Sequence, residues 1–137
     1  MPDALFRSPL RPAAVGLLLA ALTLALAGLL PSASALEWLT VVLAVVAAVY
    51  VGFGLQDTRR AVVVTEIAYA VFTLGLALGG LWVAPWLLAL GYLLHGGWDM
   101  LHFWRRPVIG TRLPWWYAAF CLTYDWPVAA YSLWRWA

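Results

Sequence analysis

Five apolar runs, each about as long as a membrane-spanning helix, constrain the fold of this chain. Short polar or proline-containing stretches separate these runs, which cover residues 12–30, 35–55, 61–80, 84–104 and 115–135. A bilayer core about 30 Å thick is crossed by roughly 20 apolar residues in a helix. Because 66% of the 137 residues are hydrophobic and only 10% are charged, the sequence predicts an all-α, polytopic membrane protein. Residues 1–137 are expected to form a single transmembrane domain with five transmembrane helices.

The positions of the arginines predict an orientation. The chain has no lysine, and seven of its eight arginines lie before the first run or after the second and fourth runs: Arg7, Arg11, Arg59, Arg60, Arg105, Arg106 and Arg112. These positions all fall on one side of the predicted membrane, and positively charged loops tend to stay in the cytoplasm. We therefore expect a multi-pass protein of the cell inner membrane with a cytoplasmic amino terminus and an outside carboxyl terminus. Only Arg135 does not fit this pattern.

Several other classes of protein are disfavoured. The arginines mark loops, so they do not indicate a nucleic-acid surface. Cys121 is the only cysteine, which excludes an intrachain disulfide and a cysteine-built zinc site. Arg7 and Arg11, the first run and the later ASA at 33–35 resemble a secretory signal. That apolar run, at about 18 residues, exceeds the usual 7–15 of a signal core, so it is predicted to be a retained helix.

The fourth run contains the segment HGGWDMLH, in which three ionisable residues are expected to share one helix face. At about 100° per residue, Asp99 lies about 40° from His95 around the helix axis, and His102 lies about 20° from it in the other direction. Gly96 and Gly97 leave room beside this stripe for a neighbouring helix or a ligand. An ionisable residue inside a bilayer costs about 2.5–3.5 kcal/mol on insertion scales, so it is normally paired, turned inward or functional.

Two further carboxylates are expected at matching depths in neighbouring runs. Glu66 lies near the start of the third run and Asp99 near the end of the fourth, which places both roughly 7–8 Å below the same surface. Asp125 lies near the middle of the fifth run, level with His95. The predicted site therefore combines two histidines with three carboxylates: His95, Asp99, His102, Glu66 and Asp125.

This constellation has more than one interpretation. Two imidazoles and three carboxylates are a ligand set suited to a divalent metal such as zinc, iron or manganese, and Asp99 or Glu66 can act as a catalytic base. Alternatively, the residues form hydrogen-bonded pairs, for instance His95 with Asp125 and His102 with Glu66, which fix the helix register. A proton relay or the ligation of a pigment is the third interpretation. No established spacing such as HExxH selects among them.

The segments LLHGGWDMLH and PWWYAAFCLTYDWPVAAYSLW resemble a family of small, uncharacterised bacterial integral membrane proteins with an HxxWDxxH signature and a later YD pair. The resemblance covers roughly residues 60–135. It implies that six residues occupy the positions of the family motif: His95, Trp98, Asp99, His102, Tyr124 and Asp125. Some relatives are expected to have a second histidine where this chain has Phe103, and the family has no known activity to carry over.

The sequence is compatible with three functions and leaves open whether the protein is an enzyme. The first is a metal-dependent enzyme that acts on a lipid or another hydrophobic substrate, since a bound metal can activate water or oxygen. The second is a non-catalytic accessory subunit of a respiratory or photosynthetic membrane complex. The third is a proton or ion pathway. The expected partners are the lipid bilayer and either further copies of the chain or a larger membrane complex.

Overall fold

The computed structural model describes residues 8–105 and 110–137. This part of the chain forms five α-helices, each overlapping one predicted apolar run: α1 Leu10–Leu29, α2 Ser32–Gly54, α3 Arg60–Trp82, α4 Trp86–Arg105 and α5 Tyr117–Trp136. Pro9, Pro31 and Pro85 stand immediately before α1, α2 and α4, where a proline is tolerated because the first amides of a helix have no partner within it. The prediction of an all-α fold is confirmed.

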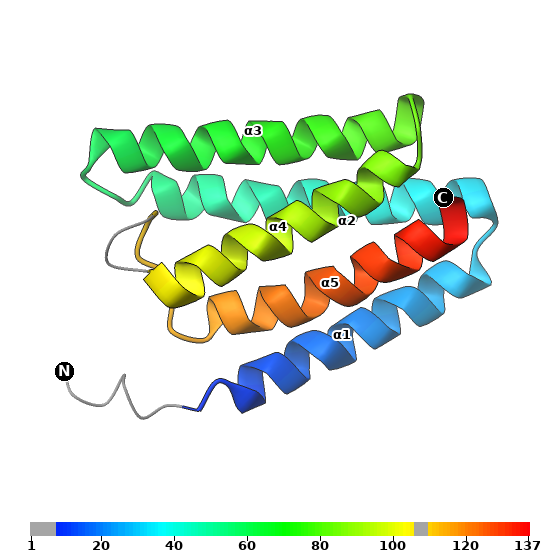
Figure 1. The fold of residues 1–137 in the computed structure, drawn as a ribbon, viewed down its shortest axis with the longest axis horizontal. Coiled ribbons are helices and arrows are strands. Elements are labelled where there is room, and N and C mark those ends of the chain that lie inside the picture. The colour runs from blue at the N-terminus through cyan, green and yellow to red at the C-terminus, as the bar shows by residue number, and fades with distance from the viewer. Residues whose placement is uncertain (1–7, 106–109) are drawn as a thin grey trace.

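The five helices lie side by side in one bundle in which consecutive helices run in opposite directions, whereas the neighbours α1 and α5 run in the same direction (Figure 1). Helix α5 packs between α1 and α4, while α3 packs between α4 and α2. Helix α2 also makes smaller contacts with α1 and α4, so the order of neighbours is α1, α5, α4, α3 and α2. This order places the inner faces of α2, α4 and α5 close together, and those faces carry most of the buried polar residues.

Three of the helices, α1, α2 and α3, are long and apolar enough to cross a membrane. Their outward surfaces expose large apolar side chains such as Leu18, Val45 and Val71, which a bilayer can cover. Helices α4 and α5 contain 20 residues each but are less apolar. The reason is that α4 and α5 contribute four ionisable residues to the interior: His95, Asp99, His102 and Asp125.

Most of the arginine positions in the described part of the chain lie at one end of the bundle. The Arg59 guanidinium donates a hydrogen bond to the Gly110 carbonyl at 3.1 Å, so the α2–α3 connection and the segment before α5 lie at the same end. The start of α1 lies at this end too (Figure 1). Arg135 lies at the opposite end, where it donates to the carbonyls of Ala27 and Leu30 at 2.8 and 3.1 Å. Arg7 and Arg106 fall outside the described residues.

Candidate metal centre and a neighbouring ion pair

All five ionisable residues predicted for the site are buried, with exposed fractions of 0–1%. They do not form one cluster. His95, Asp99 and Asp125 form a group that we call the His95 cluster, in which one potential ligand atom from each residue lies within 4.8 Å of the others. Glu66 and His102 form a separate pair. Both pairs named by the structural interpretation, His95 with Asp125 and His102 with Glu66, are present at 2.8 Å.

The His95 cluster is assembled by two helices. Nδ1 of His95 lies 2.8 Å from Oδ2 of Asp125 and 3.3 Å from Oδ2 of Asp99. Asp99 is one helical turn after His95 on α4, whereas Asp125 comes from α5. The two helices can approach closely here because of Gly96, at which a Cβ would lie 3.3 Å from Cβ of Asp125 and 2.5 Å from Cδ1 of Trp126.

Tyr50 on α2 completes the surroundings of the cluster and was missed by sequence reasoning. Its hydroxyl donates a hydrogen bond to Oδ1 of Asp99 at 2.5 Å. Its ring lies edge-on to His95 with the centroids 5.3 Å apart, and it also contacts the ring of His102 at 5.1 Å. Its position in an apolar run could have indicated a polar contact in the interior, because a buried hydroxyl needs a hydrogen-bond partner. Tyr50 therefore links α2 to both groups of ionisable residues.

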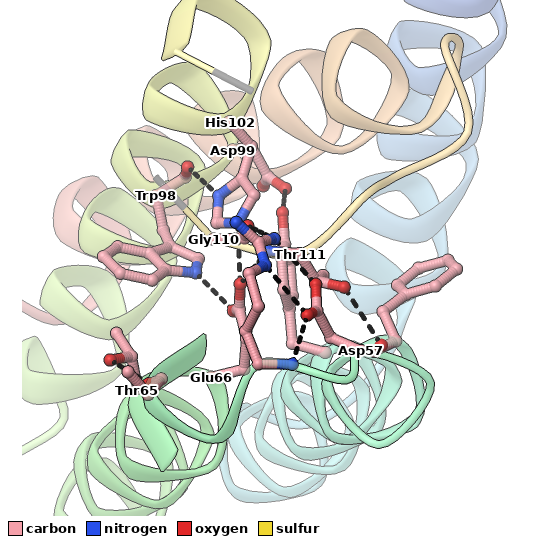
Figure 2. A network of polar contacts seen from close by, with 12 residues as sticks. Asp57, Thr65, Glu66, Trp98, Asp99, His102, Gly110 and Thr111 are labelled. Atoms are coloured by element: carbon pink, nitrogen blue, oxygen red, sulfur yellow. Dashed lines mark hydrogen bonds and ion pairs between the residues drawn. The ribbon is translucent and has the colours of Figure 1, made fainter. Parts of the chain in front are cut away.

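Glu66 is surrounded by hydrogen-bond donors (Figure 2). Its Oε1 lies 2.8 Å from Nε2 of His102 and accepts a hydrogen bond from the backbone N–H of Thr111 at 2.8 Å. Its Oε2 accepts from the indole N–H of Trp98 at 3.1 Å. The other ring nitrogen of His102 lies 2.9 Å from the carbonyl oxygen of Trp98. Since both nitrogens of His102 face acceptors, the arrangement fits an imidazolium beside a carboxylate.

Gly110 and Thr111 close over this pair, and sequence reasoning did not find them. Gly110 has φ +76°, a conformation that favours glycine. A Cβ at Gly110 would overlap Nε2 of His102 and lie 2.6 Å from Oε1 of Glu66. A glycine is therefore required here for two reasons, the backbone conformation and the space that the ion pair leaves. Thr111 is held further by a hydrogen bond from its hydroxyl to the Phe53 carbonyl at 3.1 Å.

Comparison with known protein families places this chain in one of them. The model of a family of unknown function, DUF6010, matches residues 11–136, which include all the residues of both groups. The chain belongs to DUF6010. No curated protein and no solved structure matches it. The match extends beyond residues 60–135, where the motif resemblance was noted, and it assigns no activity. Tyr124, one of the motif residues, donates to the hydroxyl of Thr23 at 3.1 Å.

The two groups in this member of DUF6010 differ in how their charges are balanced. In the pair, one histidine faces one carboxylate. In the His95 cluster, two carboxylates face one imidazole, and no arginine of the described residues pairs with either aspartate. A buried excess of negative charge is costly. The cluster therefore favours binding of a cation or protonation of one carboxyl group.

The hydrogen bonds of the cluster are also incomplete within the described part of the chain. Three buried atoms have no hydrogen-bond partner there: Nε2 of His95, Oδ2 of Asp99 and Oδ1 of Asp125. Oδ2 of Asp99 lies 3.3 Å from Nδ1 of His95, but one N–H cannot be well aligned with two acceptors, and Asp125 is closer. Buried polar atoms normally find partners, so these three atoms are available to bind a further group.

Proposed function

We propose that this protein is a membrane protein that binds one divalent metal ion through His95, Asp99 and Asp125. The observation that carries the proposal is a buried group of two carboxylates and one imidazole whose potential ligand atoms lie within 4.8 Å of one another. Each of these residues also has one buried atom without a hydrogen-bond partner among the described residues. Two carboxylates and a neutral histidine balance the charge of a divalent cation. Zinc, iron and manganese accept this combination of nitrogen and oxygen ligands.

The remaining predicted site residues have supporting roles in this proposal. Both oxygens of Glu66 already accept hydrogen bonds, so we assign Glu66 and His102 to fixing α3 and the Gly110 segment against α4. Tyr50 orients Asp99 through its hydrogen bond, as groups around metal ligands commonly do. In this proposal the His95 cluster binds the metal, and the pair of Glu66 and His102 holds the helices together.

Catalysis by this protein would depend on the metal. Three protein ligands leave a coordination position for water, which hydrolysis or oxygen activation requires. If Asp99 acts as the base instead of as a ligand, His95 and Asp125 hold the metal, and the substrate is a lipid or another hydrophobic molecule. Because the enzyme hypothesis needs the metal, metal binding is the first property to test.

A proton relay is a second candidate function, supported by a continuous series of contacts. The Tyr50 hydroxyl contacts Asp99 at 2.5 Å, Asp99 lies 3.3 Å from His95, and His95 lies 2.8 Å from Asp125. A proton shared in this series would reduce the negative charge without a metal. The two candidates therefore differ in what neutralises the carboxylates.

The proposed membrane topology includes α4 and α5 as spans. Helices α4 and α5 are antiparallel neighbours in the bundle and bury the histidines and aspartates of the two groups, while Leu93, Leu101 and Leu133 remain exposed. At 20 residues each, α4 and α5 are about 30 Å long. We infer that both also cross the membrane, with the arginine-rich end in the cytoplasm, as in a multi-pass inner-membrane protein.

Metal analysis of the purified protein tests the proposal. After exposure to zinc, iron or manganese and removal of loosely bound ions, the wild type should retain about one ion per chain. His95→Ala and Asp125→Asn should each lower the retained metal at least about tenfold. Glu66→Gln, a change of a buried carboxylate outside the cluster, should retain it. A folded wild type that binds none of these metals, or full retention in both cluster variants, would contradict the metal function.

A further inference from the structure

A polar cavity of about 380 Å³ lies at the arginine-bearing end of the bundle. It is formed by the α2–α3 connection and by the segment before α5, and we call it the Arg59–Arg112 cavity. Its lining combines polar and charged side chains with one aromatic ring: Phe53, Gln56, Asp57, Thr58, Arg59, Thr111 and Arg112. The volume falls within the range of small-ligand sites.

Arg59 is held in a fixed orientation at this cavity. Its Nε and Nη2 donate to the two carboxylate oxygens of Asp57 at 3.0 and 2.7 Å, and Nη2 also donates to the Gly110 carbonyl at 3.1 Å. These hydrogen bonds lower the pKa of Asp57 from its ordinary 3.8 to about 2, so the carboxylate stays charged at neutral pH. The guanidinium nevertheless remains 48% exposed, which leaves part of it accessible from the cavity.

Arg112 supplies a second positive charge, which helps to lower the pKa of Asp57 but forms no ion pair with it. Its side chain is exposed and makes no hydrogen bond or ion pair with the residues 8–105 and 110–137 that the structure describes. Asp57 is the only acidic residue in the lining, and Arg59 already occupies both of its oxygens. The lining therefore carries a net charge of +1, from two arginines and one aspartate.

Thr111 gives the cavity a rigid wall. Its N–H donates to Glu66 and its hydroxyl donates to the Phe53 carbonyl, so this residue is tied to the buried ion pair on one side and to α2 on another. Gln56 and Thr58 are exposed, and their side chains bring further hydrogen-bond donors to the lining. A site with fixed donors loses less entropy when a ligand binds.

We propose that the Arg59–Arg112 cavity binds a phosphate-bearing group. Arginine forks match the geometry of phosphate oxygens, and the excess positive charge disfavours a cation. The phosphate can belong to a soluble ligand or to a lipid headgroup, because the cavity lies at an end of the helix bundle, where headgroups meet the protein. This site is separate from the His95 cluster and does not rest on the proposed metal.

Binding is measured on the full-length protein in dodecyl maltoside, a detergent without phosphate. In the first arm, sodium phosphate replaces sodium chloride at constant ionic strength, and the unfolding midpoint is followed. In the second arm, phosphatidylglycerol or uncharged diacylglycerol is added, and native mass spectrometry counts the lipids retained. The wild type should show a saturable rise of the midpoint with phosphate, or retain one phosphatidylglycerol in preference to diacylglycerol.

Two variants of equal charge test the location. Arg112→Gln should weaken the binding about tenfold, since it removes charge-assisted hydrogen bonds to phosphate. Arg60→Gln removes the same charge from a neighbouring exposed residue that does not line the cavity, and it should bind like the wild type. Saturation by phosphate without retention of phosphatidylglycerol would identify a soluble ligand, and retention of phosphatidylglycerol in preference to diacylglycerol would identify a headgroup. Binding in neither arm, or equal losses in the two variants, would overturn the proposal.

Discussion

The Glu66 carboxylate accepts hydrogen bonds at both oxygens, from His102, Thr111 and Trp98. Asp125 differs, because its Oδ1 has no hydrogen-bond partner among the described residues. We predict that Glu66→Gln lowers the stability of the protein by about 3 kcal/mol, because the buried His102 loses its counter-ion. The amount of metal retained should not change, since Glu66 lies outside the His95 cluster. Unfolding of the detergent-solubilised variant, together with metal analysis, measures both quantities.

Glu37 offers a matched control for this prediction. It is exposed, so Glu37→Gln makes the same chemical change where water already solvates the carboxylate, and the stability should change by less than about 0.5 kcal/mol. If the Glu66 variant is as stable as the Glu37 variant, the pair does not stabilise the bundle. If the Glu66 variant is stable but has lost its metal, Glu66 belongs to the metal site.

The burial of the five ionisable residues could be predicted, because an ionisable side chain in an apolar run is expected to turn away from lipid. Their division into two groups was one of the alternatives that the sequence left open, because the pairs His95 with Asp125 and His102 with Glu66 follow from matching depths in neighbouring helices. The sequence could not select between this pairing and one shared site, because the choice depends on how the helices pack. Tyr50 and Thr111 come from α2 and from a connection, and only the packing of the helices brings them to the site.

The packing of α4 against α5 should be sensitive to the size of one residue. A Cβ at Gly96 would lie 2.5 Å from Cδ1 of Trp126 and 3.3 Å from Cβ of Asp125, so we predict that Gly96→Ala pushes α5 away. Overpacking of this kind costs typically about 1–3 kcal/mol, and the displaced Asp125 should weaken metal binding in parallel. Unfolding and metal titration of the same preparation test both effects.

Gly97 is the matched control, because it is adjacent on the same helix and a Cβ there meets nothing within 4 Å. Gly97→Ala should keep its metal and gain up to about 1 kcal/mol from the higher helix propensity of alanine. Equal behaviour of the two variants would show that the glycine at 96 does not set the distance between α4 and α5.

The number of helices was predictable because the apolar runs and the prolines between them are local properties of the chain. The five helices are not equally apolar: within the described residues, only α1, α2 and α3 are apolar enough to be recognised as spans by composition. Helices α4 and α5 form the walls of the buried polar site, and their polar residues lower their average apolarity while facing inward. Composition alone therefore does not identify α4 and α5 as spans, and their crossing of the membrane is part of the proposed topology.

Arg135 was the one arginine that did not fit the predicted orientation, and the bundle explains its position. Its guanidinium donates to the carbonyls of Ala27 and Leu30 and to the Tyr131 hydroxyl, so it satisfies backbone carbonyls at the carboxyl end of α1. A positive charge there also interacts favourably with the helix dipole. Arg135 therefore stabilises the carboxyl end of α1. Its position does not oppose the orientation inferred from the other arginines.

The proposed orientation makes a prediction for the whole protein in living cells. In a Cys121→Ala background, Val83→Cys is placed in the α3–α4 connection and Thr58→Cys in the α2–α3 connection, and both positions are exposed. A membrane-impermeant maleimide should label the Val83 variant in intact cells with an accessible inner membrane. It should label the Thr58 variant only after the membrane is opened, because the arginine-rich end is expected to face the cytoplasm.

Labelling after permeabilisation is the control, and it should be equal for the two variants because both side chains are exposed at ends of the bundle. The reverse pattern would place Arg59, Arg60 and Arg112 outside. The Arg59–Arg112 cavity would then open away from the cytoplasm, and a phosphate-bearing ligand would have to come from the outer leaflet or the exterior. Labelling of both variants in intact cells would contradict the two ends of the bundle lying on opposite sides of a membrane.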